Sequence, residues 1–224
     1  IRAGDIGPDH SSTRSMALAP DGDLMYTIGV TNIISGGVNR QEWEMVAYEV
    51  EDGSDPNRTA GRLTKIGVAD TASNLQKNIQ YTTIATGPTT GSHRVYLADS
   101  GRLFALTFAG TVDSPLWPLY ATNTLSNINV IVADPRGRYV YVGTDNGLFA
   151  FNVEKANPVD TSLTPVATGV SDNIDEIYID PRGEYLYTNG QGNAYRIGSD
   201  GALQLVPNNN FPGIGTDMVI VNPK

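Results

Sequence analysis

Four polar residues each stand six positions before a proline that ends a short apolar run, and they are Arg14, Asn129, Asp175 and Asp217. Carboxylate and amide oxygens are the ligands that Ca²⁺ prefers in proteins. Asn129, Asp175 and Asp217 could therefore hold a calcium ion if the fold brings them together. With Arg14 they could also form a binding site for a specific small ligand.

A repeated sequence unit positions these residues. Residues 129–144 (NVIVADPRGRYVYVGT) and 175–190 (DEIYIDPRGEYLYTNG) are near-copies that begin 46 positions apart. Each consists of an apolar strand, a D-P-R-G sequence typical of a type I turn, and a second strand with alternating apolar residues. Two further short strands follow each copy. Four strands in about 40–50 residues are typical of one blade of a β-propeller.

The sequence therefore predicts an all-β fold, a single β-propeller of four-stranded antiparallel blades with little helix. We expect four complete blades at about residues 15–77, 78–127, 128–171 and 172–213, and the first strand of a further blade at 214–224. The second unit is degenerate, with Pro88 ahead of a longer turn. A piece of a larger propeller is the favoured interpretation, and closure of the ring by a partner chain is the alternative.

In such a ring the innermost strands all begin on one face, which we call the start face. The D-P-R-G turns lie on the opposite face, the turn face, where Arg136 and Arg182 are predicted to be solvated turn residues. The polar residues six positions before the prolines would converge on the start face around the mouth of the central channel. Alternatively, Asn and Asp merely cap strand ends there, at a wet channel mouth.

The first unit carries an insertion, residues 31–43, which is predicted to be a loop on the start face. It contains a glycine pair, and Arg40 lies close to Trp43. Arginine and tryptophan are enriched at binding hot spots, so this is a candidate recognition loop. The alternative is that Trp43 packs back on its own blade. The two histidines, His10 and His93, stand in different segments without metal-ligand spacing.

The composition excludes several function classes. The formal net charge of −9 argues against nucleic acid or an anionic membrane as partner. No apolar run approaches the length of a membrane span. The absence of cysteine excludes disulfides, thiolate catalysis and cysteine-ligated metals. Together with the acidity and the few lysines, it favours an extracellular, cell-surface or periplasmic location.

The near-copies carry a family resemblance. DPRGRYVYVGT and DPRGEYLYTNG resemble the YVTN-type repeats of lactonase-like propellers and of surface-layer proteins, over about residues 128–206 and more weakly over 15–127. VGTDNGLF at 142–149 resembles the GT-x-GL repeat of periplasmic sensor propellers. The resemblance implies a WD40-like propeller. In gluconolactonase-type members it implies acid and amide side chains that hold a divalent metal, which polarises a lactone carbonyl.

Three functions remain open. The first is a non-catalytic module of an exported or surface protein, without a cofactor, that binds a protein or glycan or assembles with further blades or other chains. The second is a lactonase-like hydrolase with a metal, such as Ca²⁺, or polar groups in the central channel. The third is a redox or sensor propeller whose cofactor is held by residues outside this segment.

Overall fold

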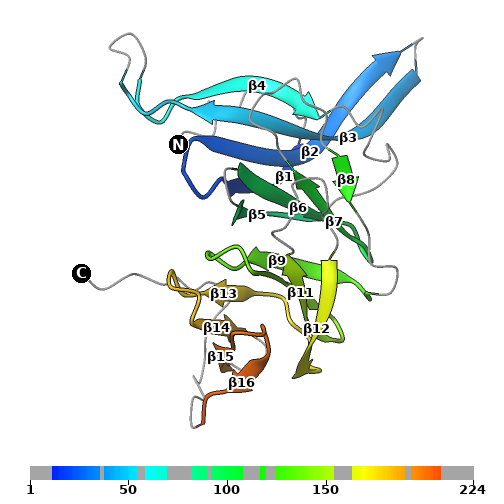
Figure 1. Cartoon of the computed structure of the whole chain (residues 1–224). Helices are drawn as coiled ribbons and strands as arrows, with labels where there is room; N and C mark the ends of the chain where they lie inside the picture. The colour runs from blue at the N-terminus through cyan, green and yellow to red at the C-terminus, as the bar shows by residue number, and fades with distance from the viewer. Residues whose placement is uncertain are drawn as a thin grey trace.

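The computed structural model describes residues 12–35, 38–54, 59–69, 82–89, 92–107, 117–119, 125–153, 163–189 and 193–207. Within these ranges the chain forms sixteen strands and no helix, arranged as four antiparallel sheets of four strands each (Figure 1). No helix in this part of the chain could therefore cross a membrane. The predicted all-β fold is confirmed, and we call the sheets blades 1 to 4.

Each blade is an up-and-down sheet whose strands follow one another in sequence order. Blade 1 contains β1 (Ser12–Leu18), β2 (Leu24–Ser35), β3 (Val38–Val50) and β4 (Leu63–Ala69). Blade 2 contains β5 (Thr83–Thr89), β6 (Ser92–Ala98), β7 (Leu103–Thr107) and β8 (Trp117–Leu119). Blade 3 contains β9 (Ile128–Ala133), β10 (Tyr139–Thr144), β11 (Gly147–Val153) and β12 (Leu163–Val170). Blade 4 contains β13 (Ile177–Ile179), β14 (Tyr185–Thr188), β15 (Ala194–Ile197) and β16 (Leu203–Leu205).

The blades stack side by side through their innermost strands, with β1 against β5, β5 against β9 and β9 against β13 (Figure 1). Side chains at alternate positions of a strand point to opposite faces of the sheet, so they pack into the apolar layers on the two sides of the blade. On β6, Val95 packs towards blade 1, whereas Tyr96 packs towards blade 3. All six residues of β10 are buried, because blades cover both of its faces.

The D-P-R-G turns have the hydrogen bonds of type I turns. The N–H of Gly137 donates to the carbonyl of Asp134 at 2.7 Å, and the N–H of Gly183 donates to the carbonyl of Asp180 at 2.8 Å. Both glycines have positive φ, 65° and 66°, which favours glycine at this position. Pro88 of the degenerate unit does not precede a longer turn. It lies inside β5, at the edge of its sheet, where a missing N–H is tolerated, and Thr89 pairs with Ser92 across a short connection.

Arg136 is not simply a solvated turn residue. Its Nη2 donates to the carbonyl of Gly183 in the next blade, and its Nε lies 3.6 Å from the carboxylate of Asp134. The sequence could not show this contact, because it depends on how closely neighbouring turns approach. Arg136 and the equivalent Arg182 are both exposed.

The insertion at 31–43 is a strand ribbon and not a loop. β2 and β3 stay paired as far as Ser35 and Val38, whereas β1 pairs only as far as Val30 and β4 only as far as Met45. The hairpin therefore extends beyond the rest of its blade (Figure 1). Threonine, isoleucine and valine favour extended backbone, which explains why the pairing continues.

Candidate functional site

Two of the predicted site residues meet on the start face, where β9 and β13 lie side by side. The Nδ2 of Asn129 donates to the Oδ1 of Asp175 at 3.1 Å across the gap between blades 3 and 4. Three further polar residues complete what we call the start-face cluster. The cluster consists of Asn127, Asn129, Asp145, Asn173 and Asp175.

Close contact between the two blades positions the cluster. The N–H of Ile174 donates to the carbonyl of Thr144 at 2.9 Å, which links the blades beside the cluster. Gly143 permits this approach, since a Cβ there would lie 2.7 Å from atoms of both Ile174 and Val130. The N–H of Asp145 then donates to the carbonyl of Asn127, so the β10–β11 turn lies beside the start of β9.

The amide nitrogen of Asn129 is surrounded by oxygen atoms. Its Nδ2 lies 3.0 Å from Asp145 Oδ1, 3.3 Å from the carbonyl of Ile174 and 3.4 Å from Asn173 Oδ1, besides the Asp175 contact. A primary amide has two protons to donate, so it cannot satisfy four acceptors at once. The centre of the cluster is therefore rich in acceptor capacity.

Both carboxylates of the cluster are exposed to solvent and held by amide donors. Asn127 donates to Asp145 Oδ2 at 2.6 Å, and Asn173 donates to Asp175 Oδ2 at 3.2 Å. The donors Asn127 and Asn129 lower the pKa of Asp145 below its usual value. Asp145 is consequently ionised at neutral pH. A carboxylate accepts more hydrogen bonds than these amides supply, so both side chains can bind additional donors.

Other predicted site residues do not join this cluster. Arg14 is exposed on β1 of blade 1, and among the described residues no hydrogen bond or ion pair connects it to the cluster. Asp217 and His10 lie outside the described residues, while His93 lies on β6.

The candidate recognition residues lie on the ribbon of blade 1. Trp43 is half-buried and packs against the apolar layer between blades 1 and 2. The backbone of Arg40 belongs to β3 and pairs with Ile33, and its side chain lies outside the described part of the structure.

Three members of the cluster were not predicted from the sequence, although two of them belong to a recognisable repeat. Asn127 and Asn173 begin the tripeptides N-I-N (127–129) and N-I-D (173–175), which are 46 positions apart like the blades. A repeated polar pair at this period predicts a shared face. Asp145 comes from the β10–β11 turn, and its approach to β9 depends on the pairing within the blade.

The hydrogen bond from Asn127 leads to a prediction about the pKa of Asp145. We expect Asn127→Ala to raise the pKa of Asp145 towards its ordinary value, because this amide is the main cause of the lowering. Because the folded pKa is lowered, the stabilisation by Asp145 is present above the unfolded pKa and is lost as the pH falls through the folded pKa. NMR titration of the side-chain carboxyl carbons measures the change. The low pKa of Asp52, caused by the N–H of Ser54, should not move.

No family model matches the chain, and no curated protein sequence matches it. Solved structures do. The periplasmic gluconolactonase PpgL of Pseudomonas aeruginosa is 14% identical with a TM-score of 0.63, and the match covers 91% of this chain and 59% of that chain. The β-propeller domain of Cps50 (Swd1) from Myceliophteria thermophila is 12% identical with a TM-score of 0.53, covering 86% and 57%.

A third similar structure is Sqt1 of Chaetomium thermophilum, solved bound to the N-terminus of a ribosomal protein. It is 12% identical with a TM-score of 0.55, covering 83% of this chain and 45% of that chain. At such identities the likeness shows the fold, which is that of a β-propeller. The chain spans about half the length of these structures.

Proposed function

We propose that this chain is a non-catalytic β-propeller module of an exported or cell-surface protein, and that the start-face cluster binds a protein ligand. The observation that supports this proposal is the set of exposed oxygens of Asp145, Asn173 and Asp175 gathered around Asn129. Such a surface binds hydrogen-bond donors, and an arginine or lysine side chain adds a favourable charge. A glycan, which would offer hydroxyl donors, is the other ligand class that the experiment below separates.

The electrostatics of Asp145 favour binding over acid–base catalysis. A general acid must be protonated, and a general base works best when its pKa is near the operating pH. The amide donors move the pKa of Asp145 in the opposite direction, away from neutrality. An ionised carboxylate of this kind is suited to attracting a cationic group.

The fold is compatible with this use. The solved structure of Sqt1 contains a propeller bound to the N-terminus of a ribosomal protein, so a protein of this fold can bind a peptide end.

The exported location rests on the acidity of the chain and its lack of cysteine. The periplasmic location of the gluconolactonase neighbour agrees with it.

A cationic peptide tests the proposed site. We expect the protein to bind hexa-arginine in isothermal titration calorimetry, and Asp145→Asn with Asp175→Asn to weaken binding roughly tenfold at physiological salt. The matched control is Glu49→Gln with Glu184→Gln, which removes the same charge from two exposed carboxylates elsewhere.

Equal weakening by the two double variants would show that only net charge matters, and would overturn the site. Binding of a neutral oligosaccharide such as maltohexaose, in place of hexa-arginine, would show that the ligand is a glycan. The D145N/D175N variant should then abolish sugar binding, whereas a protein ligand predicts that the sugar does not bind.

The second candidate function is a lactonase-like hydrolase, and the oxygen-rich centre of the cluster is the observation that favours it. Two carboxylates, amide oxygens and the carbonyl of Ile174 are the donor types that Ca²⁺ prefers, so the residues fit such an ion. Asp145 and Asp175 would hold it together with Asn129, whose amide would have to turn so that its Oδ1, in place of the Nδ2, faces the ion. A bound divalent cation would polarise a lactone carbonyl. The cluster contains two carboxylates, and no group of three or more His, Cys, Asp or Glu side chains that could hold a metal occurs among the described residues.

The two candidate functions predict different effects of calcium on the thermal stability of the protein. If the cluster binds Ca²⁺, a hundredfold excess over Kd should stabilise the fold by about 2.7 kcal/mol. This corresponds to a rise in Tm of about 5–10 °C for a chain of this length. Asp175→Ala should abolish the rise, whereas Glu184→Gln should preserve it. An unchanged Tm at millimolar calcium would contradict the calcium-dependent form of the hydrolase candidate.

A further inference from the structure

Asn129 and Asp175 of the start-face cluster are held in different ways, although they are equivalent residues of the repeat. In blade 3, β9 stays paired with β10 beyond Asn129, because Thr144 pairs with Ile128 after a shift of register. In blade 4, β13 begins only at Ile177, so Asp175 lies ahead of the strand pairing. The backbone that carries this carboxylate therefore needs another support.

Asn189, which directly follows the last residue of β14 (Tyr185–Thr188), supplies that support. Its Oδ1 accepts the N–H of Asp175 at 3.2 Å and the N–H of Glu176 at 3.0 Å. Its own N–H donates to the carbonyl of Glu176 at 3.3 Å. These bonds fix the backbone on both sides of the Asp175 side chain. One side chain thus takes the place of the strand pairing that is present in blade 3.

The repeat shows that this residue is a specific choice of blade 4. Asn189 corresponds to Gly143 of blade 3, 46 positions earlier. A Cβ at Gly143 would lie 2.7 Å from atoms of Ile174 and Val130, so a side chain does not fit there. The glycine of blade 3 allows the next blade to approach, whereas the asparagine of blade 4 holds the start of β13.

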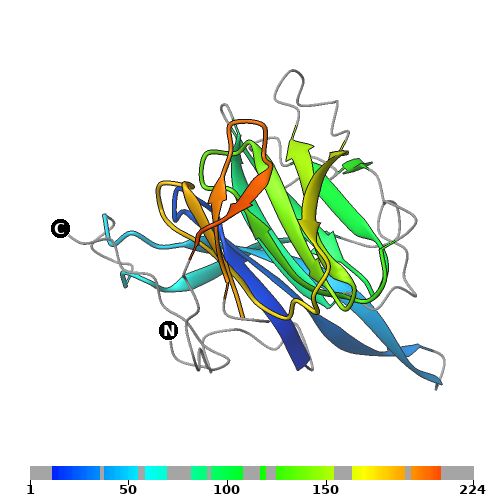
Figure 2. The same cartoon turned by 90° about the horizontal axis from the view of Figure 1, so that it is seen from below.

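The fixed backbone directs the Asp175 carboxylate into the cluster. The connection from β12 to β13, drawn from yellow to gold, crosses from blade 3 to blade 4, and Asp175 lies near its end (Figure 2). Oδ1 of Asp175 accepts from Asn129 at 3.1 Å, and Oδ2 accepts from Asn173 at 3.2 Å. Ordering a side chain or loop during binding costs free energy, so a carboxylate that is already held in place binds a ligand more tightly.

We propose that Asn189 is a positioning residue of the start-face cluster, which holds the Asp175 carboxylate in place for a cationic group of the ligand. This inference rests on the proposed function, because it concerns the same site. Asn189 acts through the backbone and does not bind the ligand with its Oδ1. A carbonyl oxygen has two lone pairs, and the N–H groups of Asp175 and Glu176 occupy both.

Calorimetric titration with hexa-arginine tests the role of Asn189. We expect Asn189→Ala to weaken binding about threefold. Asn189→Asp keeps an acceptor oxygen at this position and should bind at least as tightly as the wild type, since its added charge also attracts the peptide. In a protein that already carries Asp175→Ala, the change Asn189→Ala should cause no further loss, because the group that it positions is gone.

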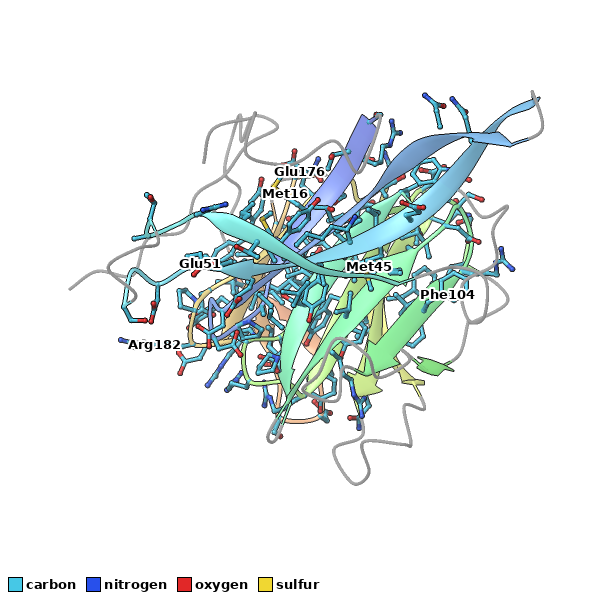
Figure 3. All side chains as sticks on the ribbon, turned by 90° about the horizontal axis from the view of Figure 1, so that it is seen from above. Met16, Met45, Glu51, Phe104, Glu176 and Arg182 are labelled. Atoms are coloured by element: carbon cyan, nitrogen blue, oxygen red, sulfur yellow. The ribbon has the colours of Figure 1, made fainter. Side chains whose placement is uncertain are left out.

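A control variant at the other end of the same hairpin separates positioning from loss of stability. Glu176, beside the cluster, and Arg182, in the β13–β14 turn, lie well apart (Figure 3). Gly183 of this turn has φ of 66°, so Gly183→Ala strains the backbone without changing the charge. We expect Gly183→Ala to lower the Tm but to leave the Kd for hexa-arginine unchanged. Circular dichroism checks that each variant is folded.

The inference is overturned if Asn189→Ala binds like the wild type, or if Asn189→Asp binds as weakly as Asn189→Ala. It is also overturned if Asn189→Ala weakens binding equally with and without the Asp175 carboxylate, or if Gly183→Ala weakens binding as much.

Failure of the proposed function gives a different result. In that case the wild type does not bind hexa-arginine, or D145N/D175N binds it as tightly as the wild type, and the role of Asn189 is refuted with the site. If D145N/D175N weakens binding and Asn189→Ala does not, the proposed function stands and only the positioning role is wrong.

Discussion

Replacing Asp134 with alanine is expected to lower the free energy of unfolding by about 2–4 kcal/mol. The Asp134 side chain is fully buried, and it accepts the N–H of Arg136 at 3.0 Å and the Nε of Arg138 at 2.9 Å. Without it, the guanidinium of Arg138, whose side chain is only 24% exposed, loses its counter-charge. Urea unfolding followed by circular dichroism measures the change.

The repeat supplies a matched control for this variant. Asp180 holds the same position in blade 4 and accepts the backbone N–H groups of Glu184 and Tyr185 at 2.6 and 2.7 Å. It is only partly buried, and no arginine side chain donates to it among the described residues. Asp180→Ala should therefore cost about 1–2 kcal/mol. If both variants lower the free energy of unfolding equally, the buried ion pair between Asp134 and Arg138 does not cause the larger loss that we expect for Asp134→Ala.

Gly137→Ala is expected to destabilise the protein by about 2–5 kcal/mol, for two reasons that add. The backbone of Gly137 has φ of 65°, a conformation that costs an L-residue about 1–2 kcal/mol. In addition, the new Cβ would collide with the carbonyl oxygen of Pro88 in blade 2. Backbone cannot rotate away as a side chain can, so blades 2 and 3 must separate.

Gly169→Ala distinguishes the two reasons. Gly169 also has positive φ, 71°, but a Cβ there meets nothing within 4 Å. We expect this variant to cost only the backbone strain, about 1–2 kcal/mol. Thermal unfolding of both variants under the same conditions gives the difference. Equal losses would mean that the contact between the turn of blade 3 and Pro88 is not tight in solution.

Much of the start-face cluster could be foreseen, and the reason is the repeat. Asn129 and Asp175 occupy equal positions in consecutive blades, so they had to lie on one face once the blades stack. Asp145 could not be foreseen, because its place depends on the pairing of β9 with β10 and on the approach of Ile174 to Gly143. The repeat also does not reveal that the amide nitrogen of Asn129 faces four oxygens.

The ribbon of blade 1 shows a different limit. The glycine pair at 36–37 and the length of the insertion suggested a loop, whereas β2 and β3 remain paired through Ser35 and Val38. Whether such a segment pairs depends on cross-strand contacts between residues that are not neighbours in sequence. Trp43 helps to hold the base of this ribbon, since it packs against the layer between blades 1 and 2.

Strand alternation, turn chemistry and a period of 46 residues are local properties, so reading the chain was enough to establish the all-β blades and their D-P-R-G turns. Contacts between blades involve residues far apart in sequence, and folding alone sets their distances. Folding therefore decided that Arg136 bonds to Gly183 in the next blade and that Asp145 joins Asn129.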